Sequence, residues 1–208
     1  MANTITKHEN LIMKIPMKEL IQNKSEIASS GKEDALEIFN STPIPNEKGE
    51  DWRYTEIEKL KLENFAPFES AVKISATELS ENLMNRGVIL TDINSALEKY
   101  PAALNYFFKS CKMDKDKFVA LSAAHFNHGI FLYVPKNLEL TEPIKVNFDM
   151  AGMNSILHNL IIVESNAHLD FIEQYSNKET AGEQLNVCVT EVFANTNSKI
   201  NFYHINNW

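Results

Sequence analysis

A 31-residue repeat near the C-terminus constrains the fold more than any other feature of the sequence. Residues 166–173 align with residues 197–204, and residues 137–140 form a weaker copy 29 positions before the first of these. The shared element is a turn asparagine followed by a strand in which apolar and polar residues alternate. Asparagine tolerates the left-handed backbone that a sharp corner needs. A fixed interval of about 30 residues made of short strands and corners predicts a stacked β-solenoid.

The strands of this repeat are expected to run parallel to one another. The Asn-Gly and Asp-Gly pairs that are typical of tight hairpins do not occur after residue 124. Parallel stacking is therefore favoured over an antiparallel meander. The alternation along each strand predicts four side chains that point inward, namely Leu169, Phe171, Ile200 and Phe202.

The earlier part of the chain has mainly helical patterns. Apolar residues over 9–29 are loosely at helical spacing, and residues 30–33 and 75–78 are Ser-x-x-Glu capping boxes that predict helix starts. We therefore expect an α+β protein. It would have a mainly helical domain over residues 1–124 and strands over residues 125–208.

Charge and composition argue against several classes of protein. Twenty Lys and Arg against 28 Asp and Glu give a formal net charge of −8, which disfavours nucleic-acid binding as the main task. The sequence has no apolar run of membrane-spanning length and no secretory signal, so we expect a cytoplasmic protein with no membrane partner. Cys111 and Cys188 lie far apart, which predicts neither a disulfide framework nor a zinc site. No nucleotide-binding motif occurs, so the chain itself should not hydrolyse ATP.

Two short segments carry residues of the kind used in recognition or metal binding. Trp52, Arg53 and Tyr54 combine aromatic rings with a guanidinium, as interface hot spots do. We favour a structural role, in which the rings anchor the loop and Arg53 pairs with a nearby acid. His125 and His128 have the spacing of two metal ligands on one helical face. Because no third ligand lies near them in sequence, a solvated or capping role is favoured.

Cys188 and His204 are the residues of the strand region whose side chains are best suited to chemistry. Thiolates bind iron and carry persulfide sulfur. Cys188 shares a strand face with Thr190 and Val192 and has no neighbouring cation, so we favour a half-buried apolar role. His204 could handle protons. A core histidine is the favoured interpretation.

Two acid pairs could be interpreted as catalytic dyads. They are Asp170 with Glu173 and Glu164 with Glu191, but nothing in the sequence brings either pair to the required separation. Cys111 is expected to be exposed and incidentally reactive. The sequence therefore assigns no catalytic, cofactor-binding or metal-binding residue.

Several segments stand in a specific order from about residue 35 to the C-terminus. They are EDWRYT (50–55), HGIFLYVP (128–135) with EPI (142–144), LIIVE (160–164) with NA (166–167), and IEQY (172–175). Their order and spacing resemble the SufD proteins of the SufB/SufD family, which form the scaffold of the SUF iron-sulfur cluster assembly system.

The resemblance implies a helical N-terminal domain followed by the first turns of a right-handed parallel β-helix. It also implies a SufB-like paralogue and a SufC-like ATPase as partners, with which clusters are built and handed to apoproteins. Family members continue for as long again, so we expect this chain to be the N-terminal half of a longer protein. The cluster-related cysteine, glutamate and histidine positions of the family lie in that later half. The iron-sulfur cluster is thus implied for the full complex and for no residue of this chain.

Two other functions stay open at this point. One is a carbohydrate-active enzyme with carboxylates in a groove, and the other is a purely structural β-solenoid. The enzyme would need acids and aromatic rings that converge on one outward face, whereas the alternation here scatters them. We therefore favour a non-catalytic scaffold. An uncapped last turn also predicts self-association, as a homo-oligomer, through residues near 186–208.

Overall fold

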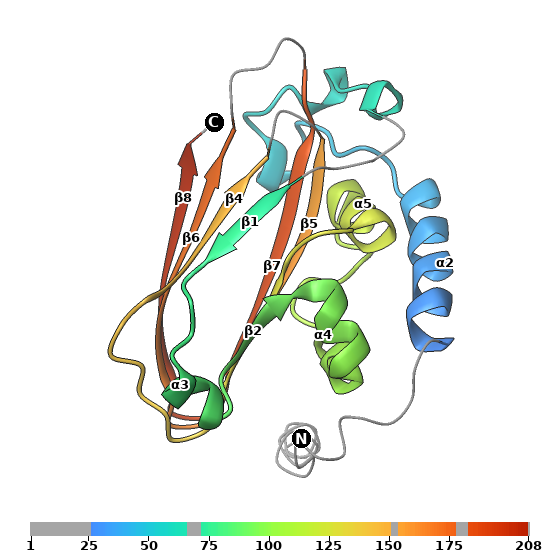
Figure 1. The fold of residues 1–208 in the computed structure, drawn as a ribbon. Coiled ribbons are helices and arrows are strands. Elements are labelled where there is room, and N and C mark those ends of the chain that lie inside the picture. Colours follow the sequence, from blue (N-terminus) through green and yellow to red (C-terminus); the bar gives the residue numbers. More distant parts are fainter. Residues whose placement is uncertain (1–25, 66–71, 151–153, 178–182, 208) are drawn as a thin grey trace, which may run out of the picture.

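The computed structural model describes residues 26–65, 72–150, 154–177 and 183–207 (Figure 1). Its α-helices are α2 (Glu26–Ser41), α3 (Glu81–Asn85), α4 (Ile93–Lys99) and α5 (Lys117–His125). Its 3-10 helices are η2 (Glu50–Trp52), η3 (Ile57–Lys59), η4 (Leu62–Phe65) and η5 (Pro101–Tyr106). Its strands are β1 (Lys73–Ala76), β2 (Ile89–Asp92), β3 (Ile130–Val134), β4 (Ile144–Asp149), β5 (Ser155–Val163), β6 (His168–Ser176), β7 (Asn186–Ala194) and β8 (Lys199–Asn207). The described helices are too short or too polar to span a membrane.

The strands form two four-stranded mixed sheets. The strand order is β1-β4-β6-β8 in one sheet and β2-β3-β5-β7 in the other. In each sheet the first pair is antiparallel, and the remaining pairs are parallel. Figure 1 shows α2, α4 and α5 on the side of the second sheet that faces away from the first. We call these the outer sheet (with β8) and the helix-covered sheet (with β7).

The fold class expected from the sequence is therefore wrong. The structure has two mixed sheets and not a mainly helical domain followed by a right-handed parallel β-helix, and β1 comes from a segment that was expected to be helical. The division of the chain at residue 124 stays a prediction.

The error at β1 has a clear physical cause. The capping box at residues 75–78 matches the start of a helix, but β1 instead pairs with β4. Two hydrogen bonds continue this pairing beyond the strand: the Thr77 N–H donates to the Lys145 carbonyl at 2.8 Å, and the Lys145 N–H donates to Thr77 Oγ1 at 2.9 Å. The helix begins later, where Ser80 accepts a hydrogen bond from the Leu83 N–H as the N-cap of α3. Long-range pairing thus outweighs a local capping signal.

Other helix predictions have mixed outcomes. The first capping box does not begin a helix, because α2 is already helical from Glu26. Pro101 follows α4 and is the first residue of η5. The helix expected over residues 9–29 falls largely outside the described residues.

The parallel pairing of the repeat is confirmed. In β6 and β8, Leu169 lies opposite Ile200 and Phe171 lies opposite Phe202. Leu169 and Phe171 are fully buried, whereas Phe202, on the edge strand, is 39% exposed. The first two side chains belong to the core between the sheets.

An asparagine ladder forms the corners between the two sheets. Asn137, Asn166 and Asn197 have φ values of 59°, 59° and 58°, which is the left-handed backbone that the repeat predicted. The Asn166 side-chain amide donates to Asn137 Oδ1 at 3.0 Å, and the Asn197 amide donates to Asn166 Oδ1 at 2.8 Å. The backbone conformation and the side-chain hydrogen bonds therefore repeat together from one corner to the next.

The sandwich has two hydrophobic cores. One lies between the sheets and includes buried residues of β4, β5 and β6, among them Phe148, Leu157, Ile161, Leu169 and Phe171. The other lies between the helix-covered sheet and its helices and includes Ile93, Leu121, Phe126, Ile156 and Leu160. Strand β5 contributes to both cores, and all nine of its residues are buried.

We predict opposite effects of one substitution at two positions of β6. Leu169→Asp would place an unpaired charge in the core between the sheets and lower the free energy of unfolding by more than about 3 kcal/mol. Ile172→Asp makes the same kind of change on the other face of the strand, where the side chain is partly exposed, and should cost less than half as much. Urea denaturation measures both values. Equal midpoints would mean that the two faces of β6 are misassigned.

We also predict that the ladder depends on backbone conformation as well as on hydrogen bonds. Asn166→Ala and Asn166→Gly remove the same side-chain amide, but only glycine adopts the φ of 59° without strain. The alanine variant should therefore be less stable than the glycine variant by about 1 kcal/mol. Thermal unfolding of the two variants provides the comparison. A glycine variant that is no more stable than the alanine variant would contradict the prediction.

Candidate functional site

A buried carboxylate, Glu173, lies at the centre of a polar cluster between the sheets. The alternation of β6 turns Glu173 inward, and the residue is only 1% exposed. Its Oε2 atom accepts hydrogen bonds from Tyr175 Oη at 3.1 Å, Thr190 Oγ1 at 3.3 Å and Asn159 Nδ2 at 3.4 Å. Its Oε1 atom lies 2.6 Å from His204 Nδ1. These partners come from β5, β6, β7 and β8, so one side chain connects both sheets.

Cys188 belongs to the same group of residues. The Tyr175 hydroxyl donates a hydrogen bond to Glu173. The Tyr175 oxygen accepts a hydrogen bond from Asn159 Nδ2 at 3.0 Å and lies 3.0 Å from Cys188 Sγ. Either atom can be the donor in the second contact, and burial keeps the thiol protonated. We call the six residues the Glu173 cluster: Asn159, Glu173, Tyr175, Cys188, Thr190 and His204.

The pKa of Cys188 agrees with this assignment. Burial raises the pKa of its thiol to about 12, even though the hydrogen bond with Tyr175 acts in the opposite direction. Burial and the neighbouring Cys188 and Glu173 also raise the pKa of Tyr175. A neutral thiol is a weak nucleophile and a weak metal ligand. The residue is half-buried and packs against the core between the sheets, as expected, and its sulfur also contacts polar groups of the cluster.

His204 links this cluster to the surface. Its side chain is 45% exposed, while Glu173, its partner, is 2% exposed in the side chain. The expectation of a core histidine is therefore wrong, because β8 is the edge strand of the outer sheet. The 31-residue alignment already placed Glu173 opposite His204, and the pairing of β6 with β8 has this register. The repeat thus contained the signal for this contact.

A second buried ionic pair lies on the other face of the helix-covered sheet. His158 Nε2 is 3.2 Å from Glu191 Oε2, and both side chains are fully buried. Three backbone N–H groups and one hydroxyl also donate to Glu191, from Phe108, Ser110 and Cys111. Burial opposes ionisation, but the contact with His158 and the hydrogen bonds from Cys111 and Phe108 outweigh it and lower the pKa of Glu191. His158 was not predicted from the sequence; it lies beside Asn159 in the middle of β5, whose other residues are mostly apolar.

The structure separates the two acid pairs that the sequence suggested. Asp170 lies on the outward face of β6 and accepts a hydrogen bond from Asn201 at 2.6 Å, whereas Glu173 lies inside. Glu164 accepts a hydrogen bond from Asn195, whereas Glu191 accepts its hydrogen bonds from residues 108–111. Neither pair has the shared site that a glycosidase mechanism requires.

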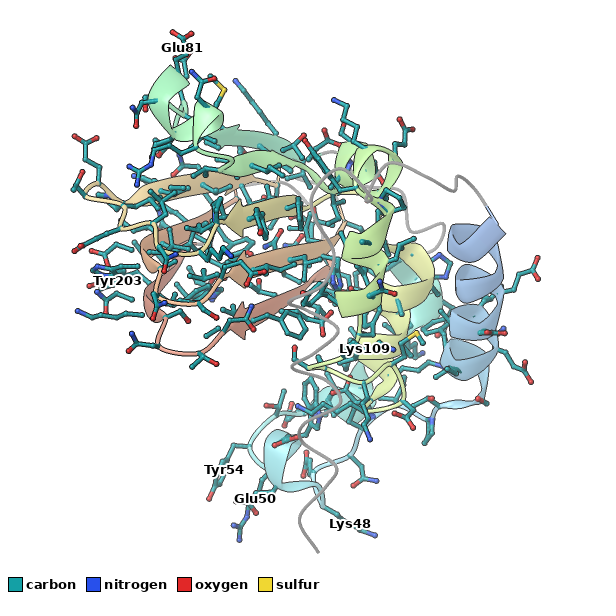
Figure 2. The ribbon with its side chains drawn as sticks, turned by 90° about the horizontal axis from the view of Figure 1, so that it is seen from below. Lys48, Glu50, Tyr54, Glu81, Lys109 and Tyr203 are labelled. Atoms are coloured by element: carbon teal, nitrogen blue, oxygen red, sulfur yellow. The ribbon has the colours of Figure 1, made fainter. Side chains whose placement is uncertain are left out.

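The aromatic and basic segment after η2 is divided between two roles. Trp52 packs on Phe118 of α5, with ring centroids 5.1 Å apart, and Arg53 lies 3.7 Å from Glu50. The anchoring role is confirmed for these two residues. It is wrong for Tyr54, which is 92% exposed and projects away from the ribbon in Figure 2.

The two histidines before β3 make different contacts. His125, at the end of α5, packs edge-on against Phe39 of α2 with ring centroids 5.7 Å apart. The His128 backbone carbonyl accepts a hydrogen bond from the His158 N–H. Across the described ranges, the structure contains no group of three His, Cys, Asp or Glu side chains that could hold a metal ion.

We predict that Tyr175→Phe destabilises the protein although it keeps the aromatic ring. The ring stacks on Phe148 at 4.8 Å and would stay in place. Without the hydroxyl, Glu173 loses a donor and Cys188 loses a hydrogen-bond partner, so the free energy of unfolding should fall by about 1 to 3 kcal/mol. Tyr203→Phe, at a tyrosine that is 53% exposed on β8, is the control and should have almost no effect. Equal stability of the two variants in chemical denaturation would contradict the role of the hydroxyl.

Comparison with known proteins identifies two family regions that meet inside β4. Residues 72–146 match the SufBD protein N-terminal region, and residues 147–208 match the SufBD core domain of SUF system FeS cluster assembly. These matches cover both sheets and leave α2 and the 3-10 helices η2 to η4 outside.

Individual relatives are named for iron-sulfur cluster assembly. The chain is 31% identical over 133 residues to the iron-sulfur cluster assembly protein SufD of Bacillus subtilis, which covers 62% of this chain and 30% of that protein. It is 30% identical over 138 residues to a SufBD family protein of Trieres chinensis, covering 64% of this chain and 28% of the relative. A third, from Staphylococcus aureus, is 30% identical over 146 residues, or 69% of this chain and 31% of the relative. The chain thus spans about a third of the length of these relatives. Both regional matches and the named relatives agree, and the chain belongs to the SufBD family.

Proposed function

We propose that the protein is a SufD-like scaffold subunit of SUF iron-sulfur cluster assembly. The observation that supports this most strongly is the succession of the two SufBD family regions, which together extend over every described strand. In this proposal the protein acts with a SufB-like paralogue and a SufC-like ATPase, and the iron-sulfur cluster is the cargo of the complex.

The chemistry of the described residues favours a structural role for this part of the protein. The Cys188 thiol is protonated and lies against the Tyr175 hydroxyl, and the Glu173 carboxylate is occupied by four partners. The candidate acid pairs lie on different faces or elements. The side chains that the sequence singled out as candidate functional groups therefore stabilise the two packed sheets. We propose that the protein is not itself an enzyme and that it acts in the cytoplasm.

The proposal is tested by assembly with partners. The full polypeptide that carries these residues is mixed with the SufB-like and SufC-like proteins of the same organism and analysed by size-exclusion chromatography with light scattering. We expect one complex that contains all three proteins and that transfers a cluster to an apo-ferredoxin. The polypeptide alone should show no ATPase activity.

The two β6 variants separate a fold-dependent complex from non-specific association. Ile172→Asp should still form the complex, whereas Leu169→Asp, which disrupts the core between the sheets, should not. Elution of the wild-type polypeptide by itself in the presence of both partners would contradict the proposal. Equal recovery of the Leu169→Asp variant in the complex would show that the described sandwich has no part in assembly.

A further inference from the structure

A short segment between η5 and α5 is attached to the helix-covered sheet through one carboxylate. We call residues 107–111 the strap. Glu191 accepts four hydrogen bonds from it: from the Phe108 N–H at 2.5 Å, the Ser110 N–H at 2.8 Å, Ser110 Oγ at 2.9 Å and the Cys111 N–H at 3.1 Å. Glu191 itself lies on β7, which is paired along its length with β5. The strap is therefore fixed to a rigid strand at a single side chain.

The other hydrogen bonds of the strap do not attach it to the sheets. The Phe107 N–H donates to the Leu104 carbonyl, and the Lys109 N–H donates to the Tyr106 carbonyl, both at 3.2 Å. Both acceptors belong to η5, the element that directly precedes the strap. Within the described part of the chain, Glu191 thus supplies all the hydrogen bonds that join the strap to a sheet.

The strap covers a buried histidine. The Phe107 ring stacks on His158 with centroids 4.6 Å apart, and the Phe108 ring lies 4.5 Å from the same imidazole. His158 is fully buried, and neither of its ring nitrogens has hydrogen-bond geometry to a described residue, although Nε2 lies 3.2 Å from Glu191. The two phenylalanine rings and the Glu191 carboxylate therefore enclose the imidazole on the side of the strap.

The backbone of the strap is also strained. Phe108 has a φ of 53°, in the left-handed region that a bulky side chain rarely adopts. Such a conformation persists only where the surrounding contacts enforce it. Its own N–H group donates the shortest of the four hydrogen bonds to Glu191. The strain and the attachment are therefore located at the same residue.

We propose that the strap is a latch that Glu191 holds closed, and that its release uncovers His158 and exposes the half-buried Cys111 more fully while both sheets stay folded. The closed form keeps the strained backbone of Phe108, and opening relieves that strain. Two interactions oppose opening: the four hydrogen bonds to Glu191, and the packing of Phe107 and Phe108 against the core under the helices. Local opening of this kind is the expected behaviour of a segment with few attachments to a stable sheet.

The two cysteines of the chain provide reporters of local and global opening. Cys111 is part of the strap, whereas Cys188 lies in the Glu173 cluster between the sheets. The wild-type protein and Glu191→Gln are treated with iodoacetamide, and the modification of each cysteine is followed separately by peptide mass spectrometry. Glutamine keeps the shape of the side chain but removes the charge and one acceptor atom. Because the charge of Glu191 also raises the pKa of the Cys111 thiol, the rates are measured over a range of pH and compared for the fully ionised thiolate. On that basis we expect Cys111 to react at least about tenfold faster in the variant, with no change at Cys188.

A control on the same strand removes packing without touching the anchor. Val189 is buried on the face of β7 that also bears Glu191, so Val189→Ala removes apolar packing from that face. This variant should leave the ratio of the two labelling rates close to that of the wild type. Equal acceleration of both cysteines in Glu191→Gln would indicate global unfolding and overturn the proposal. An unchanged rate at Cys111 would overturn it as well.

A milder variant covers the case in which Glu191→Gln does not fold. Ser110→Ala removes one of the four hydrogen bonds and leaves the carboxylate in place. The expected result is a few-fold faster modification of Cys111 alone. A rate equal to that of the wild type would show that the carboxylate is not what holds the strap.

Discussion

A buried negative charge at Glu173 requires four strands to be in one particular register. A carboxylate in the interior is stable only when its oxygens accept hydrogen bonds or pair with a cation. The donors come from both sheets, and His204 on β8 supplies the shortest contact. A shift of β8 by one residue would turn His204 outward and bring an apolar or aromatic neighbour inward. The Glu173 cluster therefore selects one register among several that the apolar residues alone would permit.

Much of the C-terminal part could be predicted because its information is local and repeated. The asparagine corners, the parallel pairing and the inward positions of Leu169 and Phe171 all follow from a 31-residue interval and a two-residue alternation. The contact between Glu173 and His204 was contained in the same alignment, although the sequence alone did not show that these residues face each other inside a sandwich. The repeat shows which residues of successive strands are equivalent. Packing against the second sheet decides which face of each strand is buried.

The rest could not be predicted because distant partners decide it. Residues 75–78 carry a capping signal for a helix, yet β4 provides a strand partner for this segment about 70 positions later. His158 stands in an apolar strand, and only the return of residues 107–111 places aromatic rings over it. The two SufBD family regions meet within β4, which pairs with β1 from the first region and with β6 from the second. A strand shared in this way explains why helical and strand patterns along the chain did not correspond to separate structural units.

The asparagine ladder has a consequence for the chemical ageing of the protein. Each side-chain amide nitrogen in the ladder donates to the oxygen of the preceding corner. Deamidation of Asn166 to aspartate would replace that donor with an acceptor and place a negative charge next to the Asn137 oxygen. The same change would leave the Asn197 amide with a stronger acceptor, so damage at one corner would weaken one rung of the ladder and strengthen the other. Slow loss of ammonia would therefore act on the corners unevenly, before any change in the apolar cores.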